Sequence, residues 1–131
     1  MGIRDAEHEE SSPEAPTLFI SRLACSLVGK TQKIAIAPDS LAHRAYGKDE
    51  VMEQFYCSYG LNRTFRSELD NGTLNVTGVD PEGAVRIVEL SDHPFYLATL
   101  FVPQASSKPD APHPLVVSYV EAAIGFQAGR K

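Results

Sequence analysis

The strongest constraint on the fold is a hairpin pattern in the middle of the 131-residue chain. Residues 74–79 alternate apolar and polar side chains, which is typical of a strand with one wet face. The next four residues, Asp80-Pro81-Glu82-Gly83, predict a tight turn, because proline fixes φ at the second position and glycine supplies a positive φ. Apolar residues resume over 85–88 as the returning strand. The sequence therefore predicts an antiparallel pair inside an α/β domain.

Further strands are expected on both sides of this hairpin. A short β-prone run covers residues 17–20, and residues 33–37 alternate before they meet Pro38. Residues 50–59 are rich in aromatic and β-favouring side chains, which predicts another strand. The uncharged run over residues 95–102 has the character of a strand that is buried on both faces.

Helices are expected at three places. Asp39 or Ser40 can N-cap a short helix through Ala45 that Gly47 ends. A helical stretch follows Asn62 and closes before residues 71–72. Near the end of the chain, apolar residues over 115–124 recur at the helical period, which predicts a helix whose apolar stripe faces the core. The proline-rich segment 103–114 between them is expected to be irregular.

Charge divides the chain into two parts and excludes several functions. Residues 1–14 carry −4 of the total charge of −5, so residues 1–15 are expected to form an acidic arm or loop and residues 16–131 the domain. The nearly neutral domain lacks the basic surplus that phosphate backbones demand, so no nucleic-acid partner is expected. No apolar stretch approaches the ~20 residues of a membrane span, and no secretory signal opens the sequence. A cytoplasmic protein is the expectation.

The two cysteines do not predict a metal site. Cys25 and Cys57 have neither a zinc spacing nor the spacing of a redox pair, and the histidines lack further ligands at useful spacing. We therefore expect two free thiols, no metal and no cofactor.

Several separated motifs resemble the class I glutamine amidotransferase domain of CTP synthase. Residues 87–104, IVELSDHPFYLATLFVPQ, resemble the segment VELPDHPFFVATQFHPE, which closes that domain with the His and Glu of a Cys-His-Glu triad. Residues 38–42 (PDSLA), 53–62 (EQFYCSYGLN) and 78–83 (GVDPEG) are similar to further family motifs in the same order. The resemblance covers residues 15–125. It implies part of a doubly wound, flavodoxin-like α/β fold with a mixed sheet, a hairpin and a C-terminal helix, and a link to pyrimidine nucleotide synthesis.

The chain departs from this family at the positions that carry its chemistry. Val102 stands where the family has the triad histidine, and Gln104 where it has the glutamate. A valine has no nitrogen that can accept a thiol proton, and a neutral glutamine cannot stabilise an imidazolium. No Gly-x-Cys-x-Gly elbow occurs in the chain either. The sequence therefore predicts a domain that does not hydrolyse glutamine by the family's mechanism.

Three functions remain open at this point. The first is a non-catalytic binding or regulatory module for a small amine or amino acid, with Tyr56, Cys57, Ser58 and Tyr59 as candidate ligand-binding residues. The second is an enzyme that uses the Cys57 thiol for chemistry other than glutamine hydrolysis. The third is a structural remnant whose function belongs to the other half of the domain.

An enzyme that uses the Cys57 thiol requires a base to accept the thiol proton. The sequence offers His93, together with His43 and His113, but no spacing identifies one of them as the partner of Cys57. The alternative to a catalytic role for His93 is a structural one, in which its ring hydrogen-bonds a loop backbone.

The resemblance also predicts a partner. The chain looks like the C-terminal half of the family's domain, and half of a sheet leaves an open edge and an uncovered apolar face. We expect a homodimer, or a partner polypeptide that supplies the N-terminal half.

Overall fold

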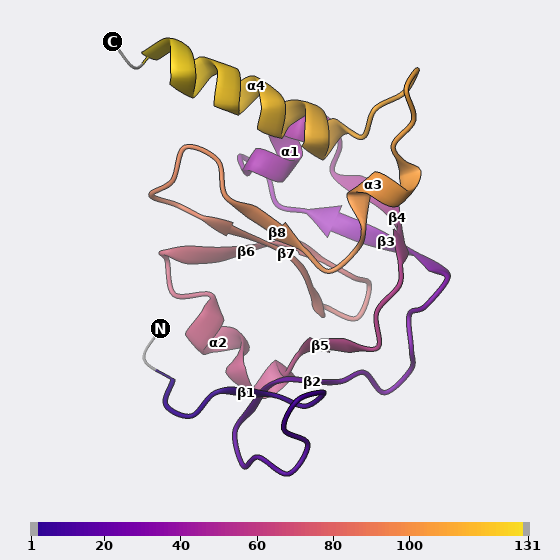
Figure 1. Ribbon diagram of the computed structural model, residues 1–131, viewed down its shortest axis with the longest axis vertical. Coiled ribbons are helices and arrows are strands. Elements are labelled where there is room, and N and C mark those ends of the chain that lie inside the picture. Colours follow the sequence, from indigo (N-terminus) through magenta and orange to yellow (C-terminus); the bar gives the residue numbers. More distant parts are fainter. Residues whose placement is uncertain (1–2, 130–131) are drawn as a thin grey trace.

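The computed structural model, which describes residues 3–129, contains two sheets and an α-helix that lies across one end of the larger sheet (Figure 1). The main sheet has the order β4-β3-β6-β7-β8, and every neighbouring pair in it is antiparallel. Its strands are β3 (Lys30–Ile36), β4 (Glu50–Phe55), β6 (Leu74–Val79), β7 (Val85–Leu90) and β8 (Leu97–Thr99).

The smaller sheet has the order β1-β2-β5 and combines both kinds of pairing. Strand β1 (Glu7–His8) runs parallel to β2 (Leu18–Arg22), and β2 runs antiparallel to β5 (Tyr59–Leu61). Part of the expected acidic arm is thus drawn into a sheet. The helices are α1 (Leu41–Tyr46), the 3₁₀ turn η1 (Arg63–Phe65), α2 (Arg66–Leu69), α3 (Pro103–Ser106) and α4 (Pro114–Gly129). The expected α/β class is confirmed.

The β6–β7 hairpin forms as its sequence predicts. One carboxylate oxygen of Asp80 accepts the backbone N–H groups of Glu82 and Ala84, each at 2.9 Å, and Gly83 adopts φ +81°. Gly78 lies at a register shift in β6, where a Cβ atom would come within 2.6 Å of the Ile87 side chain. The hairpin therefore requires glycine at Gly78 for close packing and at Gly83 for its backbone conformation.

The predicted helix boundaries near α1 and η1 are also confirmed. The hydroxyl oxygen of Ser40 accepts the N–H of His43 at 3.0 Å, and Gly47 ends α1 with φ +66°. The side chain of Asn62 accepts the N–H of Thr64 at 3.1 Å and caps η1.

The core lies between the main sheet and the elements at its α4 end. Ile34, Phe55 and Ile87 are its largest fully buried side chains. The remaining buried apolar members of this cluster are Leu27, Ile36, Ala42, Phe101 and Leu115.

The interpretation of residues 95–102 as a strand buried on both faces is wrong. Only Leu97–Thr99 form strand β8, in which Ala98 is exposed and the two flanking residues are half-buried. Among residues 3–129, strand β8 pairs only with β7 and forms the edge of the sheet, so its outer edge has no neighbouring strand. The strand expected over residues 50–59 is likewise interrupted after Phe55, and it continues as β5 in the other sheet.

Helix α4 forms where it was predicted, but its apolar stripe does not face the core. Leu115 is its only buried residue, while Tyr119, Val120 and Ile124 are 59, 48 and 62 % exposed. The helix contacts α1 and α3, and it then projects beyond the sheet (Figure 1). None of the helices within residues 3–129 combines the length and apolar character needed to cross a membrane.

Candidate functional site

The two positions that resemble the family's triad histidine and glutamate, Val102 and Gln104, lie at the start of α3. Val102 is half-buried and precedes Pro103, the first residue of that helix, and Gln104 is exposed one residue further on. The backbone N–H of Val102 donates a long hydrogen bond of 3.5 Å to the carbonyl oxygen of Gln54 on β4. Neither side chain has an atom that titrates near neutral pH, so this corner of the fold offers no general base of its own.

Both thiols are free, and they differ in their exposure to solvent. Cys25 is exposed, whereas Cys57 is half-buried and packs against the hydrophobic core. Burial raises the pKa of the Cys57 thiol, although the positive charge of Arg86 opposes this shift. Within residues 3–129, no hydrogen bond joins either thiol to an imidazole, so the structure shows no activated Cys–His pair.

The other three candidate ligand residues point to different partners. The hydroxyl of Tyr56 donates to the Gln54 side chain at 3.2 Å, and the Ser58 hydroxyl lies 3.1 Å from that of Ser26. Tyr59 receives a hydrogen bond of 3.2 Å from Arg22, whose guanidinium also lies over the Tyr59 ring. These residues therefore do not converge on one point.

The candidate bases His93 and His43 have local partners. The Nδ1 atom of His93 accepts the backbone N–H of Phe95 at 3.1 Å, and its ring packs edge-on against Tyr96. The Nε2 atom of His43 lies 2.8 Å from Asp49 in an exposed pair. His93 thus hydrogen-bonds a loop backbone, as expected of a residue with a structural role in this turn.

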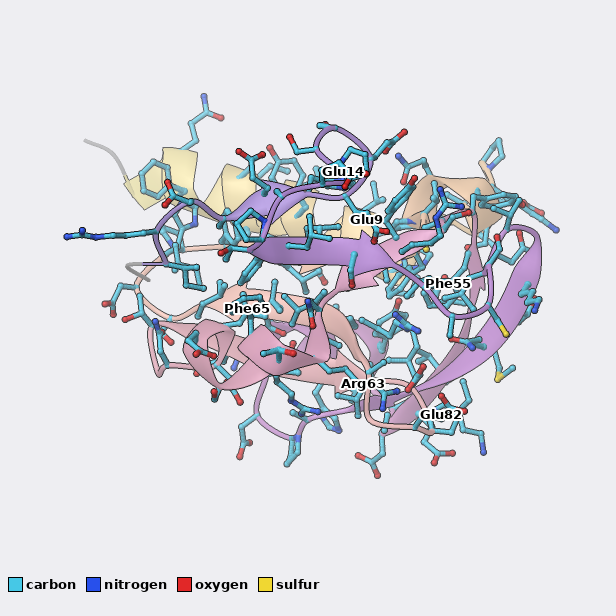
Figure 2. All side chains as sticks on the ribbon, turned by 90° about the horizontal axis from the view of Figure 1, so that it is seen from below. Glu9, Glu14, Phe55, Arg63, Phe65 and Glu82 are labelled. Carbon is cyan, nitrogen blue, oxygen red and sulfur yellow. The ribbon has the colours of Figure 1, made fainter. Side chains whose placement is uncertain are left out.

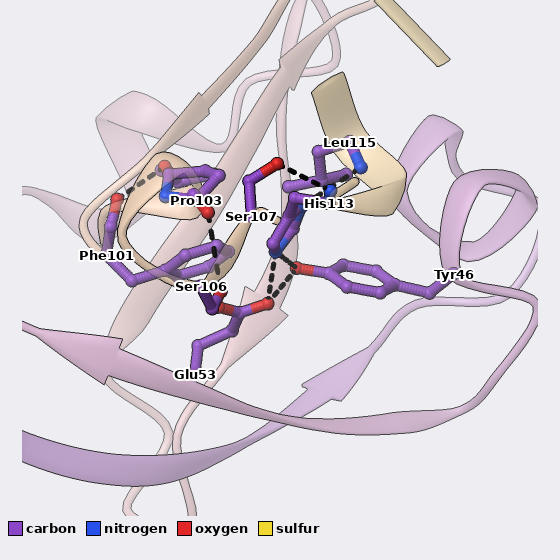
Figure 3. Close-up of polar contacts among 9 residues, drawn as sticks. Tyr46, Glu53, Phe101, Pro103, Ser106, Ser107, His113 and Leu115 are labelled. Atoms are coloured by element: carbon purple, nitrogen blue, oxygen red, sulfur yellow. Dashed lines mark hydrogen bonds and ion pairs between the residues drawn. The ribbon is translucent and has the colours of Figure 1, made fainter. Parts of the chain in front are cut away.

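A buried polar cluster, which the sequence reasoning missed, joins Tyr46, Glu53 and His113 (Figure 3). One carboxylate oxygen of Glu53 lies 2.6 Å from Nε2 of His113 and accepts the Tyr46 hydroxyl at 2.7 Å. Glu53 and His113 are each 4 % exposed. The Nδ1 atom of His113 accepts the backbone N–H of Leu115 at 3.1 Å, so the proton of the ring sits on Nε2 and is donated to Glu53.

The local structure explains how this cluster assembles. Val51, Glu53 and Phe55 alternate along β4 and point to the covered face, so the sequence places an acid among core positions. The Ser107 hydroxyl accepts the backbone N–H of His113 at 2.9 Å and fixes the loop before α4. The alternation of β4 could have revealed Glu53, because it places this acid among the buried positions of the strand. A buried acid needs hydrogen-bond donors, so a polar cluster could have been expected there.

The cluster has a structural role, because it holds α1 and the loop before α4 against strand β4. Both ring nitrogens of His113 are occupied, and burial together with Glu53 raises the pKa of Tyr46, which keeps its hydroxyl protonated as a donor. An open cavity of about 690 Å³ adjoins the cluster, and Lys33, Lys48 and Glu50 stand around it. No set of three or more histidine, cysteine, aspartate or glutamate side chains is placed to hold a metal ion anywhere in the described part of the chain.

Comparison with known proteins identifies the class of domain to which this fold corresponds. The glutaminase domain of a Trypanosoma brucei CTP synthase, solved with bound acivicin, superimposes with a TM-score of 0.85 at 25% identity, over 95% of this chain and 52% of that one. A putative GMP synthase subunit from Thermoplasma acidophilum shares the fold at 9% identity and a TM-score of 0.62. The fold is that of a glutaminase domain.

The sequence comparisons are more specific. The chain is 34% identical to a CTP synthase of Carboxydothermus hydrogenoformans over 94% of its own length, and 31% identical to that of Cytophaga hutchinsonii over all of it. These matches span 25 and 26% of the two enzymes, about a quarter of their length. No protein-family model matches the sequence. The chain is a relative of the glutamine amidotransferase domain of CTP synthases, as its motifs predicted.

Proposed function

We propose that this chain is a non-catalytic member of the CTP synthase glutaminase lineage that acts as a small-molecule-binding or regulatory module. The observation that carries the proposal is the pair of side chains at Val102 and Gln104, which stand at the positions that resemble the triad histidine and glutamate. Proton transfer from a thiol requires a group that titrates near the working pH, and neither of these side chains does.

The surroundings support this proposal because, within residues 3–129, no hydrogen bond joins any of the four imidazoles to a thiol, and the Nδ1 atom of His8 accepts the backbone N–H of Glu10. His113 donates to Glu53 and accepts from Leu115, so it has no free lone pair for a substrate. His93 and His43 hydrogen-bond a loop backbone and an exposed carboxylate. A nucleophile without a general base, and without the strained turn that exposes it, does not attack an amide at a useful rate.

The ligand that we propose is a small amine or amino acid, bound near residues 56–59. The related trypanosomal domain binds acivicin, which shows that a domain of this fold can hold a small molecule. Free thiols suit a reducing compartment, so the proposal includes a cytoplasmic location.

The decisive test is ammonia release from glutamine, measured with this chain and with the trypanosomal glutaminase domain under the same conditions. We expect release by the trypanosomal domain and none above the buffer background by this chain. Release above the buffer background that disappears when the same protein preparation is heat-denatured would refute the non-catalytic assignment. Binding is tested separately by titrating glutamine and acivicin into the protein and following amide chemical shifts of residues 56–59.

The competing function is an enzyme that depends on the Cys57 thiol. One observation favours it, because the positive charge of Arg86 acts to lower the pKa of this thiol. Burial outweighs that effect, so the thiol is expected to be less ionised than a free one. Iodoacetamide labelling against pH in a Cys25→Ser background isolates Cys57. We expect a midpoint at or above about 8.5; a midpoint below 7 would favour the thiol enzyme.

We further propose that the domain associates with a second copy of itself or with a polypeptide that supplies the rest of the glutaminase fold. The exposed stripe of α4 and the edge strand β8 support this proposal, since both leave apolar or unpaired groups uncovered.

A further inference from the structure

The three asparagines of the chain differ in the residue that follows each of them. Asn71 precedes Gly72, whereas Asn62 and Asn75 precede residues with larger side chains. A glycine has no Cβ atom to hinder the approach of its own backbone nitrogen to the preceding side chain. The Asn71–Gly72 pair lies in the exposed connection between α2 and β6, and none of the candidate sites described above includes it.

The fold polarises the side-chain carbonyl group of Asn71. Its Oδ1 atom accepts the backbone N–H groups of Thr73 at 3.1 Å and of Leu74 at 3.2 Å. Two backbone donors that point at one oxygen stabilise the negative charge that develops on it during an attack on the attached carbon, as they do in an oxyanion hole. The Cγ atom of Asn71 is therefore an activated electrophile.

The neighbouring nucleophile and the leaving group are both free of hydrogen bonds. Among residues 3–129, neither the backbone N–H of Gly72 nor the Nδ2 atom of Asn71 donates to another group. Gly72 has φ +90°, and beyond its chain neighbours no atom lies within 4 Å of the place where a Cβ would stand. Neither nitrogen has to break a hydrogen bond with the protein before it reacts.

Asn62 lacks this combination of features. Its Nδ2 atom donates to the carbonyl oxygen of Leu18 at 2.8 Å, so the leaving group is held by the protein. The residue that follows it is Arg63, whose long side chain pairs with Glu82 at 3.6 Å (Figure 2). Asn62 is therefore a natural control for an asparagine whose side chain is anchored.

Asn75 lacks it for a different reason. The backbone nitrogen that would attack this side chain belongs to Val76, and it already donates to Asp70 at 3.1 Å. Asn75 also lies within β6, opposite Glu89 on β7, and its Nδ2 atom donates to the hydroxyl of Ser91 at 2.5 Å. Asn75 is therefore a second control, in which the nucleophile and the leaving group are both bound.

We propose that Asn71 is a deamidation site, at which the folded chain converts itself to aspartate and isoaspartate forms with water as the only co-reactant. The Gly72 nitrogen forms a bond to Cγ of Asn71 and gives its proton to a solvent base. The Cγ–Nδ2 bond breaks, and ammonia leaves after it takes up a proton from water. Water then opens the cyclic imide, at Cγ to give aspartate or at the backbone carbonyl to give isoaspartate, and no electrons are transferred.

The two products have different consequences for the fold. Aspartate at position 71 keeps a side-chain oxygen for the two N–H groups of the turn. Isoaspartate carries the main chain through the side chain, which adds one backbone atom directly before β6. Its effect falls on Thr73, whose carbonyl oxygen accepts the N–H of Ser91 at 2.8 Å. The isoaspartate form therefore loosens the contact between the start of β6 and the end of β7.

Peptide mapping of the folded full chain, after incubation at pH 7 and at pH 9, tests the proposal. Trypsin places Asn62 in peptide 49–63 and the other two asparagines in peptide 67–86, where fragmentation by mass spectrometry separates them. We expect Asn71 to react at least about tenfold faster than Asn62 or Asn75. The reaction should be faster at pH 9, because base removes the amide proton. Equal rates at the three asparagines, or no reaction at Asn71, would overturn the proposal.

A synthetic peptide of residues 67–86 separates the contribution of the fold from that of the sequence, because it has the same asparagine–glycine pair without the contacts of the fold. We expect Asn71 of the folded chain to react faster than in the peptide, or at most about threefold more slowly. A slower reaction than this would show that the fold protects the pair, which contradicts the structural argument.

Matched variants locate the reaction. Asn71→Gln should abolish the product, because the longer side chain would have to close a six-membered ring, whereas Asn75→Gln should leave the rate at Asn71 unchanged. Product in peptide 67–86 of the Asn71→Gln variant would place the reaction at another residue and refute the assignment.

Discussion

The clearest energetic prediction concerns Glu53, which holds the buried cluster together. Its carboxylate accepts from Tyr46 at 2.7 Å and from His113 at 2.6 Å, and it is almost completely buried. Glu53→Ala leaves two donors, the buried imidazole of His113 and the half-buried hydroxyl of Tyr46, without this acceptor. Each orphaned donor costs about 1–3 kcal/mol, so the free energy of unfolding should fall by about 2–6 kcal/mol. Removal of the buried carboxylate itself recovers part of this cost, which favours the lower half of that range.

Glu50 provides a matched control on the same strand. It is exposed and pairs with Lys33 at 3.5 Å, so Glu50→Ala should cost less than about 0.5 kcal/mol. Glu53→Gln keeps an acceptor of similar shape and should fall between the two alanine variants. Because native domains are stable by only about 5–15 kcal/mol, the predicted loss is large enough to measure.

The measurement is urea denaturation followed by far-ultraviolet circular dichroism, with the unfolding slope compared between variants. We expect the order Glu50→Ala, Glu53→Gln, Glu53→Ala in increasing destabilisation, at unchanged slope. If Glu53→Ala and Glu50→Ala unfold within 0.5 kcal/mol of each other, the cluster does not clamp α4 to β4 and the reasoning is refuted.

Three further predictions follow from single features of the structure. Since burial and Glu53 raise the pKa of Tyr46 above its ordinary value of 10.0, the folded state holds this proton more tightly, and stability should fall as the pH rises past 10; Tyr46→Phe should flatten that fall in alkaline titrations, and an unchanged slope would contradict it. Gly78→Ala should destabilise the protein by about 1–3 kcal/mol in thermal melts because its Cβ meets Ile87, whereas Gly125→Ala, in open space on α4, should stabilise by about 0.5–1 kcal/mol; equal shifts would argue against the close packing. Size-exclusion chromatography with light scattering should give a dimer, and a clean monomer counts against self-association.

Local chemistry explains which parts of the fold could be predicted from the sequence. The turn at Asp80 and Gly83 and the caps at Ser40 and Gly47 depend on residues within four positions of one another. Side-chain acceptors and the freedom of glycine decide such features almost independently of the rest of the molecule.

The features that were predicted wrongly depend on what covers a surface. The period of residues 115–124 correctly predicted a helix, but it cannot tell whether a neighbouring element packs there, and the apolar side chains of Tyr119, Val120 and Ile124 are exposed. The apolar run at 95–102 likewise does not reveal its neighbours, and only its residues Leu97–Thr99 form a strand, which lies at the edge of the sheet. The contact between Glu53 and His113 joins residues that are 60 positions apart, so no spacing rule could have found it.

The buried carboxylates also explain how this scaffold could persist without a triad. Glu89 accepts the backbone N–H groups of Leu41 and Ala42 and the hydroxyl of Thr77, and it thereby ties α1 to the sheet. Asp80 binds its own turn and Arg86, and Glu53 binds α1 and the loop before α4.

Glu89 and Glu53 join segments that are distant in the sequence, whereas Asp80 joins its own turn to Arg86 on the next strand, and all three satisfy buried donors that would otherwise be costly. Val102 and Gln104 make no comparable side-chain bonds among the described residues. The groups that stabilise this fold are therefore different from the positions that resemble the triad. Substitutions at those two positions can remove proton transfer while the hydrogen bonds that define the domain remain, and this separation is what makes a folded, non-catalytic relative of a glutaminase physically reasonable.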